Sequence, residues 1–245
     1  MAKVLTDNLS APLDSATTAR VDINCGPGHL TIDRLAGGEQ LLAGGTLQYQ
    51  AKQGPPIQSL NANNGQVTLT LQGSHASRSG FRWPWEACRP GAYEWRVHLN
   101  PTVSYDITAR SDGGNVKLDL AGLVVTRLLA ENGGGNMDML LPDRAANLGV
   151  AVSTGGGNVN VEIGNGTTGS NSVDASSGAG NVVVRVPGSM AARIRATSGL
   201  GKVIVDPQFS KVDAHTYQSP DYDSAANKVE ITLKSGAGNV SVTAK

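Results

Sequence analysis

Residues 113–142 read GGNVKLDLAGLVVTRLLAENGGGNMDMLLP, and this stretch decides the fold. A glycine turn ending in asparagine leads into VKLDL, where apolar and polar residues alternate, and the pattern returns as GGGN followed by MDMLL. Alternation with a period of two places one face of a strand in the core and the other in water. Glycine and asparagine both tolerate the backbone of a sharp corner. The repeated unit predicted here is therefore strand, glycine turn, strand.

The same unit recurs along the chain, with one residue marking the end of each turn. Successive markers are 21 to 23 residues apart, except for a last interval of 37. Earlier copies begin at Gly26 (GPGHLTID) and, more weakly, at Asn64 (NGQVTLTL), and apolar residues such as Ile107 and Ala109 precede the turns. We predict an all-β fold, a β-solenoid or β-helix-like stack of about 22-residue strand–Gly turn–strand repeats. The markers, which we interpret as stacked structural corners, are Asn115, Asn136, Asn158, Asn181 and Asn239, with Lys202 in the same position.

Two interruptions of the repeat define the expected domain organisation. Residues 1–17 form an N-terminal extension, and residues 18–100 form an N-terminal β module with an aromatic insertion at 72–95. Residues 101–245 form the repeat region, with a late insertion at 206–223. An all-β architecture of 245 residues can be one domain, so we expect these parts to be continuous.

The composition excludes several classes of protein. The chain has 20 Lys+Arg and 20 Asp+Glu, and this zero balance argues against a nucleic-acid surface or a polybasic membrane anchor. An apolar content of 39% together with a charged content of only 16% argues against disorder. No signal peptide or long apolar run is present, so a soluble, cytoplasmic protein is expected, with peripheral membrane association as the alternative. Cys25 and Cys88 are either two free thiols or one bridge.

The sequence contains no convincing catalytic, cofactor or metal motif. Residues 164–169 match GxGxxG, but turn and strand residues follow where a dinucleotide site needs a helix. No GxSxG motif occurs, and the four histidines lack a second His or Cys at metal-ligand spacing. His215 and Asp213 in the late insertion fit either a solvated loop or a carboxylate–histidine metal site. We predict no catalytic, cofactor-binding or metal-binding residue.

The aromatic residues gather in the first insertion. Residues 81–95 hold five of the ten aromatics, including every tryptophan. Trp95 alternates with Val97 and Leu99, which predicts a core position. The other aromatic residues either cover an open end of the fold or contact a protein, a glycan or the membrane interface. The candidate contact residues are Phe81, Arg82, Trp83, Trp85, Arg89 and Tyr93.

Three stretches resemble a known family. They are VDINCGPGHLTI with the following LLAGG (21–45), YEWRVHLNP (93–101) and residues 113–142. Together with the later GxGN turns they resemble the toast-rack domain family, the soluble β-domain of LiaF-type cell-wall-active antibiotic response proteins, and they are similar to adhesin-type β-repeats. The resemblance implies a β-helix-like stack in a protein linked to bacterial envelope stress. It implies no catalytic residue.

These observations favour a non-enzymatic interaction or scaffold module that binds a protein partner, which would be membrane-associated in the family context. The first alternative is an adhesin-like or carbohydrate-binding module that uses Trp83, Trp85 and Tyr93. The second is a β-helix glycan hydrolase, which would need two or three carboxylates converging in a groove. An end-to-end dimer is left open, because strand edges at the ends of such a stack must be capped or paired.

Overall fold

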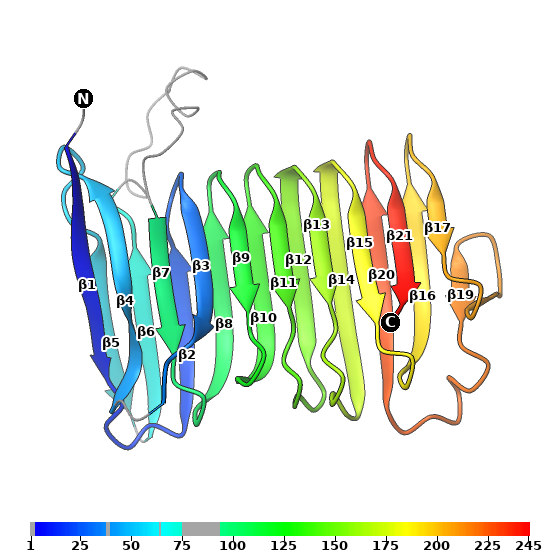
Figure 1. The fold of residues 1–245 in the computed structure, drawn as a ribbon, viewed down its shortest axis with the longest axis horizontal. Coiled ribbons are helices and arrows are strands. Elements are labelled where there is room, and N and C mark those ends of the chain that lie inside the picture. The colour runs from blue at the N-terminus through cyan, green and yellow to red at the C-terminus, as the bar shows by residue number, and fades with distance from the viewer. Residues whose placement is uncertain (1–2, 38–39, 64, 75–93) are drawn as a thin grey trace.

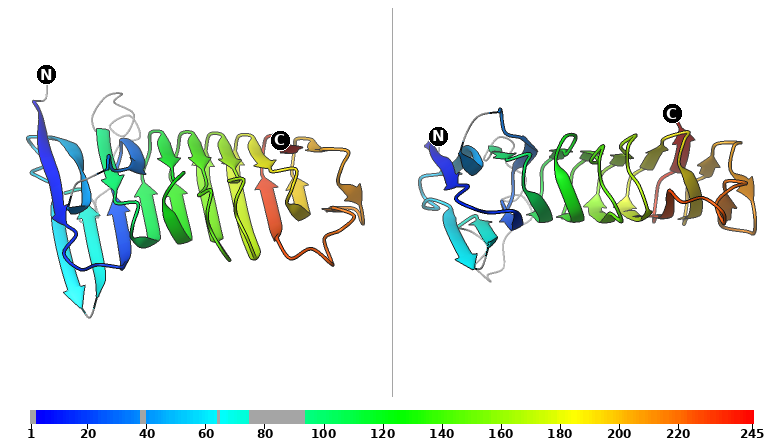
Figure 2. Two further views of the ribbon diagram at one scale, coloured as in Figure 1. Left: turned by 60° about the horizontal axis from the view of Figure 1, so that its bottom comes forward. Right: turned by 90° about the horizontal axis from the view of Figure 1, so that it is seen from below.

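The computed structural model describes residues 3–37, 40–63, 65–74 and 94–245. These residues form two β-sheets that face each other, and no helix occurs among them (Figures 1 and 2). In spatial order, sheet A contains β1 (Val4–Pro12), β4 (Leu41–Gln50), β7 (Glu94–Leu99), β3 (His29–Arg34), β9 (Val116–Asp119), β11 (Met137–Leu140), β13 (Val159–Glu162), β15 (Val182–Val186), β21 (Val240–Ala244) and β17 (Val203–Val205). Sheet B contains β18 (Ser210–Lys211), β19 (Thr216–Gln218), β16 (Ala191–Ser198), β20 (Lys228–Ser235), β14 (Ser170–Ala179), β12 (Gly149–Gly156), β10 (Val124–Asn132), β8 (Ser104–Ser111), β2 (Thr18–Asn24), β6 (Gln66–Gln72) and β5 (Ile57–Asn63).

Each repeated unit contributes one strand to each sheet. A strand of sheet B is followed by the glycine corner and then by a strand of sheet A, as in β8–β9, β10–β11 and β12–β13. Equivalent strands of adjacent units pair in parallel and in register, so Met137 lies opposite Val116 on one side and Val159 on the other. The predicted all-β class is confirmed, and the repeated sequence pattern corresponds to a repeated pairing.

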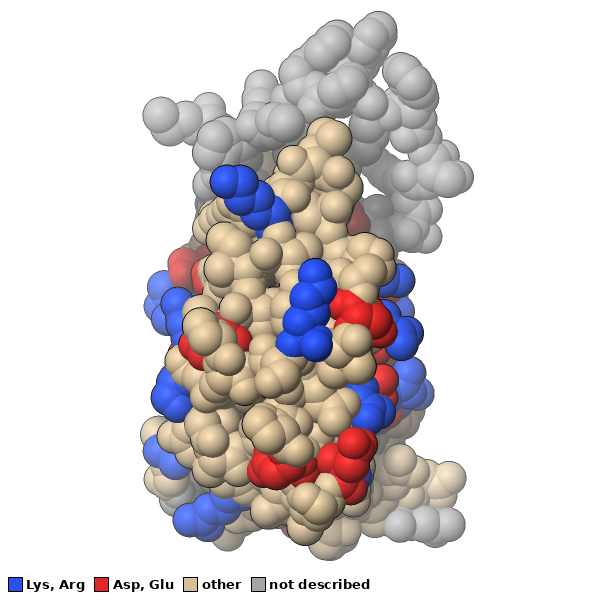
Figure 3. Space-filling view, turned by 90° about the vertical axis from the view of Figure 1, so that its right-hand side faces the viewer, with Lys and Arg blue, Asp and Glu red and all other residues tan. Residues whose placement is uncertain are grey.

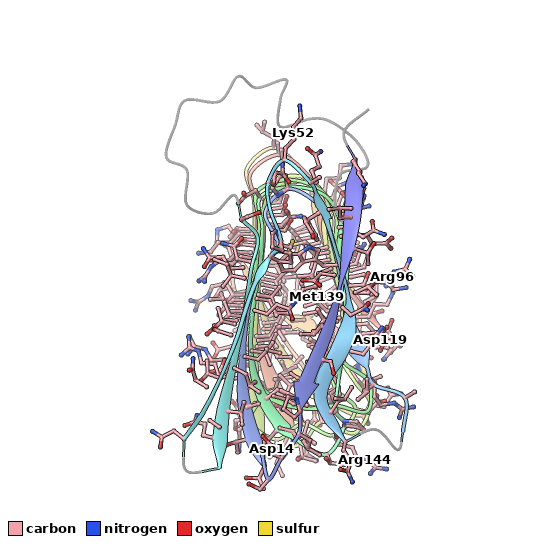
Figure 4. The ribbon with its side chains drawn as sticks, turned by 90° about the vertical axis from the view of Figure 1, so that its left-hand side faces the viewer. Asp14, Lys52, Arg96, Asp119, Met139 and Arg144 are labelled. Atoms are coloured by element: carbon pink, nitrogen blue, oxygen red, sulfur yellow. The ribbon has the colours of Figure 1, made fainter. Side chains whose placement is uncertain are left out.

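The core lies between the two sheets. Alternate residues of each strand point inward, and Met139, Val161 and Val184, which lie in adjacent units, are no more than 4% exposed. Seen from the N-terminal end, Met139 points between the sheets, whereas Arg96 and Asp119 point outward (Figure 4). The apolar residues before the turns are also buried, including Ile107 and Ala109. The alternation predicted from the sequence is thus confirmed on both strands of the unit.

The order of the units in space differs from their order in the chain at the C-terminal end. The last unit, β20–β21, lies between β14–β15 and β16–β17 (Figure 1). The chain passes from β15 to β16 across the place that β20 and β21 later fill. Residues 206–227 then return to that place through β18 and β19.

The strand predicted in the repeat copy at Asn64 belongs to the other sheet. The sequence pattern treats residues 66–72 as the strand after a glycine turn, which would place them in sheet A. Instead β6 pairs in parallel with β2 in sheet B, so it is the strand before a corner. Its companion in sheet A is β7, which pairs with β3. The aromatic insertion therefore stands where the other units have their glycine turn.

Different elements lie at the two ends of the molecule. The segment predicted as an N-terminal extension contributes β1, which pairs antiparallel with β4 at the edge of sheet A. Sheet B ends at β5, and the side-chain amide of Gln58 on β5 donates a hydrogen bond to Asp7 on β1 (3.2 Å). At the other end, β18 and β19 extend sheet B, and Phe209 and Tyr222 are buried there.

Candidate functional site

The glycine corners stack directly on one another. At Gly114, Gly135, Gly157, Gly180 and Gly238, a Cβ atom would lie 2.0–2.3 Å from a carbonyl oxygen of the adjacent unit. The backbone of one corner therefore occupies the space that a side chain would need. This close approach requires glycine at these places, independently of the positive φ found at several of them.

The marker asparagines form a continuous ladder along the corners. The Oδ1 atom of each one accepts a hydrogen bond from the backbone N–H of the next marker, at 2.8–3.1 Å. Nδ1 of His29 is the acceptor at the first position (3.1 Å), and the N–H of Lys202 is the last donor (2.9 Å). In spatial order the members are His29, Asn115, Asn136, Asn158, Asn181, Asn239 and Lys202. The structure thus brings together all five predicted corner residues.

A second polar ladder, which the sequence analysis missed, lies inside the corners. Ser111, Asn132, Thr154 and Ser177 are buried and donate hydrogen bonds to corner carbonyls, such as that from Ser177 to Gly157 (2.8 Å). Buried carbonyls need such partners, because leaving one unsatisfied is costly. Each of these residues stands four positions before a marker, and so do Cys25, Ser198 and Ser235. That fixed offset is the signal that would have found them.

The outer face of sheet A carries a shallow depression of about 230 Å³. It crosses β9, β11, β13 and β15, and its lining residues are Lys117, Leu118, Asp119, Asp138, Met139, Leu140, Asn160, Glu162 and Arg185. The side chains of Leu118 and Met139 are buried, so the strand backbone forms the floor. Both signs of charge are present, on four adjacent strands held by parallel pairing.

The carboxylates in this depression are engaged by their neighbours. Asp138 accepts a hydrogen bond from the side-chain amide of Asn160 (2.7 Å), and Asp119 accepts one from the N–H of Ala121 (3.3 Å). Glu162 accepts a hydrogen bond from Nζ of Lys245 (2.8 Å), which lowers the pKa of its carboxyl group. Glu162 is therefore held in its charged form, which suits ionic contacts better than donation of a proton.

The predicted contact residues Phe81, Arg82, Trp83, Trp85, Arg89 and Tyr93 lie outside the described residues, and so does Cys88. The strands that flank this insertion are described. Gly73, after β6, donates its N–H to Asn24 O (2.8 Å), and Trp95 on β7 is 1% exposed. The indole N–H of Trp95 donates to Gln48 O (3.1 Å). The predicted core position of Trp95 is confirmed. The described residues on either side of the insertion, Gly73 and Glu94, lie at the glycine-corner edge of the fold.

The remaining polar candidates lie apart from one another. His98 contacts Asp33 on the outer face of sheet A, and Asp213 accepts hydrogen bonds from the backbone N–H groups of His215 and Thr216. The latter contacts lower the pKa of Asp213. Within residues 3–37, 40–63, 65–74 and 94–245, no three His, Cys, Asp or Glu side chains are grouped as a metal site would require.

The GxGxxG segment forms the opposite corner of a unit. It connects β13 to β14, so a strand follows it where a dinucleotide site would have a helix. Thr167 donates its hydroxyl to Pro142 O (3.2 Å) and Gly164 O (3.1 Å). A Cβ atom at Gly164 would lie 2.2 Å from Pro142 O. These glycines serve close packing between units.

The paired sheets and the ladders at their corners define an all-β repeat protein. The chain belongs to the family described as the N-terminal domain of toast_rack, DUF2154, whose model matches residues 2–162. The resemblance found in the sequence is therefore confirmed. The match begins in the segment that contains β1 and ends with β13, so the units that follow lie beyond it.

Solved structures give a similar fold. A "putative cell adhesion protein" from Clostridium sporogenes superposes with a TM-score of 0.71 at 20% identity, covering 99% of this chain and 100% of that one. A "putative adhesin" from Bacteroides fragilis has a TM-score of only 0.33 at 11% identity, with coverage of 98% and 97%, and supports no argument. No curated protein matches the sequence. Among the described residues, no helix is long and apolar enough to cross a membrane.

Proposed function

We propose that this protein is a non-enzymatic interaction module, a β-solenoid that presents the outer face of sheet A to a protein partner in the bacterial envelope-stress context of its family. The observation that carries the proposal is the mixed-charge depression over β9, β11, β13 and β15. Its charged side chains stand on four strands fixed by pairing, so binding costs little additional backbone ordering. A partner with complementary charges would find a preformed surface there.

An adhesin-like role fits the same face. The structure from Clostridium sporogenes is described as that of a "putative cell adhesion protein", and its fold covers 99% of this chain. A glycan would be bound by the polar side chains of the depression or by Trp83, Trp85 and Tyr93, for which contact with a partner stays a prediction. The context of the toast-rack family favours a protein as the first ligand to test.

The hydrolase alternative is less well supported by the same depression. Three carboxylates, those of Asp119, Asp138 and Glu162, do line it. A glycosidase, however, needs one carboxylic acid with a raised pKa. Contact with Lys245 lowers the pKa of Glu162. Asp138 accepts a hydrogen bond from Asn160, and Asp119 accepts one from the N–H of Ala121. The arrangement favours binding over acid–base chemistry.

A charged substitution in the depression tests the proposal. Asn160→Arg places a long side chain in the depression, whereas Ser172→Arg places the same side chain on the exposed outer face of sheet B. Immobilised wild-type protein and both variants are incubated with two fractions of a bacterial envelope, detergent-solubilised membrane proteins and purified cell-wall glycan. We expect wild type and Ser172→Arg to retain one protein. Asn160→Arg should retain about tenfold less of that protein, or less still.

Other outcomes have definite meanings. Retention of glycan alone, sensitive to Asn160→Arg, replaces the protein partner by the adhesin-like alternative. Equal retention by all three proteins, or none by wild type, excludes the sheet A face as the binding surface. Turnover of the glycan fraction that Glu162→Gln abolishes would establish the hydrolase instead.

A further inference from the structure

The last strand of sheet A has a free side. β17 pairs with β21, and no other described strand pairs with it. Lys202 O accepts the N–H of Val240, and the N–H of Asp206 donates to Val242 O, so these groups face β21. Since alternate residues of a parallel strand face the same neighbour, the N–H and C=O groups of Val203 and Val205 point away from β21. They form a short row of backbone donors and acceptors at the end of the molecule.

Exposed apolar side chains lie at the same end of the molecule. Leu200 in the preceding corner is 86% exposed, and Ile204 at the centre of β17 is 53% exposed. Val212, which follows the last strand of sheet B at the same end, is 62% exposed. Uncharged surface covers most of this end of the molecule, with Lys/Arg and Asp/Glu side chains at scattered positions (Figure 3). Exposed apolar residues beside a free strand edge are typical of an interaction surface.

The other edges carry more polar residues. On β1 the exposed positions include Thr6, Asn8 and Ser10, and on β5 they include Asn61 and Asn63. Polar side chains on an edge strand discourage further pairing. β1 and β5 each expose one large apolar residue, Val4 (45% exposed) and Ile57 (58% exposed). Among the described edges, however, β17 is the one whose strand is entirely apolar, Val-Ile-Val.

The sequence around Ile204 is complementary to itself. A two-fold axis through Ile204 would bring the β17 strands of two copies together antiparallel, with Val203 opposite Val205 of the second copy. The free groups of these residues would then form the hydrogen-bonded pairs, and the two Ile204 side chains would meet in a non-hydrogen-bonded pair. Lys202 would lie opposite Asp206 of the second copy on both sides of the axis. Moving the axis to Val205 would place Pro207, which has no N–H, opposite Val203 and lose both charge pairs.

We propose that β17 is a homodimer interface, in which two copies of this chain join their A sheets antiparallel about Ile204. The two pairs of Lys202 and Asp206 fix the register and prevent head-to-tail growth, because β1 offers no matching charges at its outer face. The proposal goes beyond the proposed function. The depression on sheet A ends at β15, and β21 separates it from β17, so a monomer would still be able to bind its partner there.

Charge reversal tests the register. The mass of the 25.2 kDa chain is followed by sedimentation equilibrium over a range of concentrations up to the solubility limit. We expect a weak dimer for wild type. Lys202→Asp and Asp206→Lys should each weaken it about tenfold or more, because each creates two like-charge pairs. An equimolar mixture of the two variants should dimerise again, because every pair then joins an acidic to a basic side chain.

The Asp206 carboxylate also accepts the N–H groups of Gln208 and Ala244, so Asp206→Lys removes contacts within the fold as well. A cross-link provides a second test that leaves Asp206 unchanged. In a Cys88→Ser background, Ile204→Cys should give a disulfide-linked dimer on mild oxidation. Ser241→Cys, the register partner of Ile204 on β21, is one strand from the edge and should remain monomeric. A wild-type protein that stays monomeric at every concentration, forms larger assemblies, or cross-links equally at both positions overturns the proposal.

Discussion

At the scale of single residues, the neighbouring backbone dictates the corner glycines. Gly157 has φ +125°, and a Cβ atom there would lie 2.3 Å from the carbonyl oxygen of Gly135 in the adjacent unit. Gly156, its chain neighbour, has open space around its missing Cβ. Two consecutive glycines in the same GGGN sequence thus have different roles. One is required by packing between units, and the other is not.

We predict that Gly157→Ala lowers the free energy of unfolding by about 1–3 kcal/mol from backbone strain alone, and by more when the adjacent corner is displaced. Gly156→Ala is the matched control and should change stability little. Urea denaturation followed by circular dichroism measures both values. Equal stability of the two variants would contradict the stacked-corner geometry.

The two polar ladders differ in how visible they are in the sequence. The outer ladder repeats one residue type, from Asn115 to Asn239, so its period is plain. The inner ladder is chemically mixed, because Ser111, Asn132 and Thr154 can each donate a hydrogen bond to a corner carbonyl. A search for repeated residue types therefore misses it, although its offset from the outer ladder is constant. A search for buried donors at a fixed offset would succeed.

At the scale of elements, strand β15 shows why the strands were predictable. Val182, Val184 and Val186 are fully buried, whereas Val183 and Arg185 face outward. Period-two alternation is a local property, so the sequence alone identifies the inward face. The same locality explains the error at β6. The pattern QVTLTL is equally suited to either sheet, and only its pairing with β2 shows which one it joins.

We predict opposite outcomes for Val184→Asp and Val183→Asp. Val184 is 0% exposed, and an unpaired carboxylate at that position should lower the free energy of unfolding by about 4 kcal/mol or more, enough to unfold a protein of ordinary stability. Val183 lies beside Asn160 and Ser241 on the outer face, where a carboxylate remains hydrated. Thermal melting of both variants tests which residues of β15 face the core. A native melting curve for Val184→Asp would contradict the assigned faces.

At the scale of the whole molecule, the corner ladder accounts for the displaced unit. Each marker except Lys202 offers a side-chain acceptor to the next unit. In chain order Lys202 would interrupt the ladder between Asn181 and Asn239. With β20–β21 placed before β16–β17, Lys202 becomes the last member, where no acceptor is needed. Two features of the sequence reflect this arrangement: the lysine at marker position 202 and the 37-residue interval that follows it. The spacing of markers alone, however, does not give the order of the units in space.

Paired cysteines test this order directly. Ser172 on β14 and Arg193 on β16 both have Glu230 of β20 as their register partner, one on each side. Adjacent strands are about 4.8 Å apart and alternate strands about 9.6 Å, whereas a disulfide needs Cα atoms within about 7 Å. In a Cys88→Ser background, Ser172→Cys with Glu230→Cys should therefore oxidise to an intramolecular disulfide. Ser172→Cys with Arg193→Cys should stay reduced. A stack in chain order would reverse both results, because β14 and β16 would then be neighbours, and mass spectrometry of the digested proteins distinguishes the two arrangements.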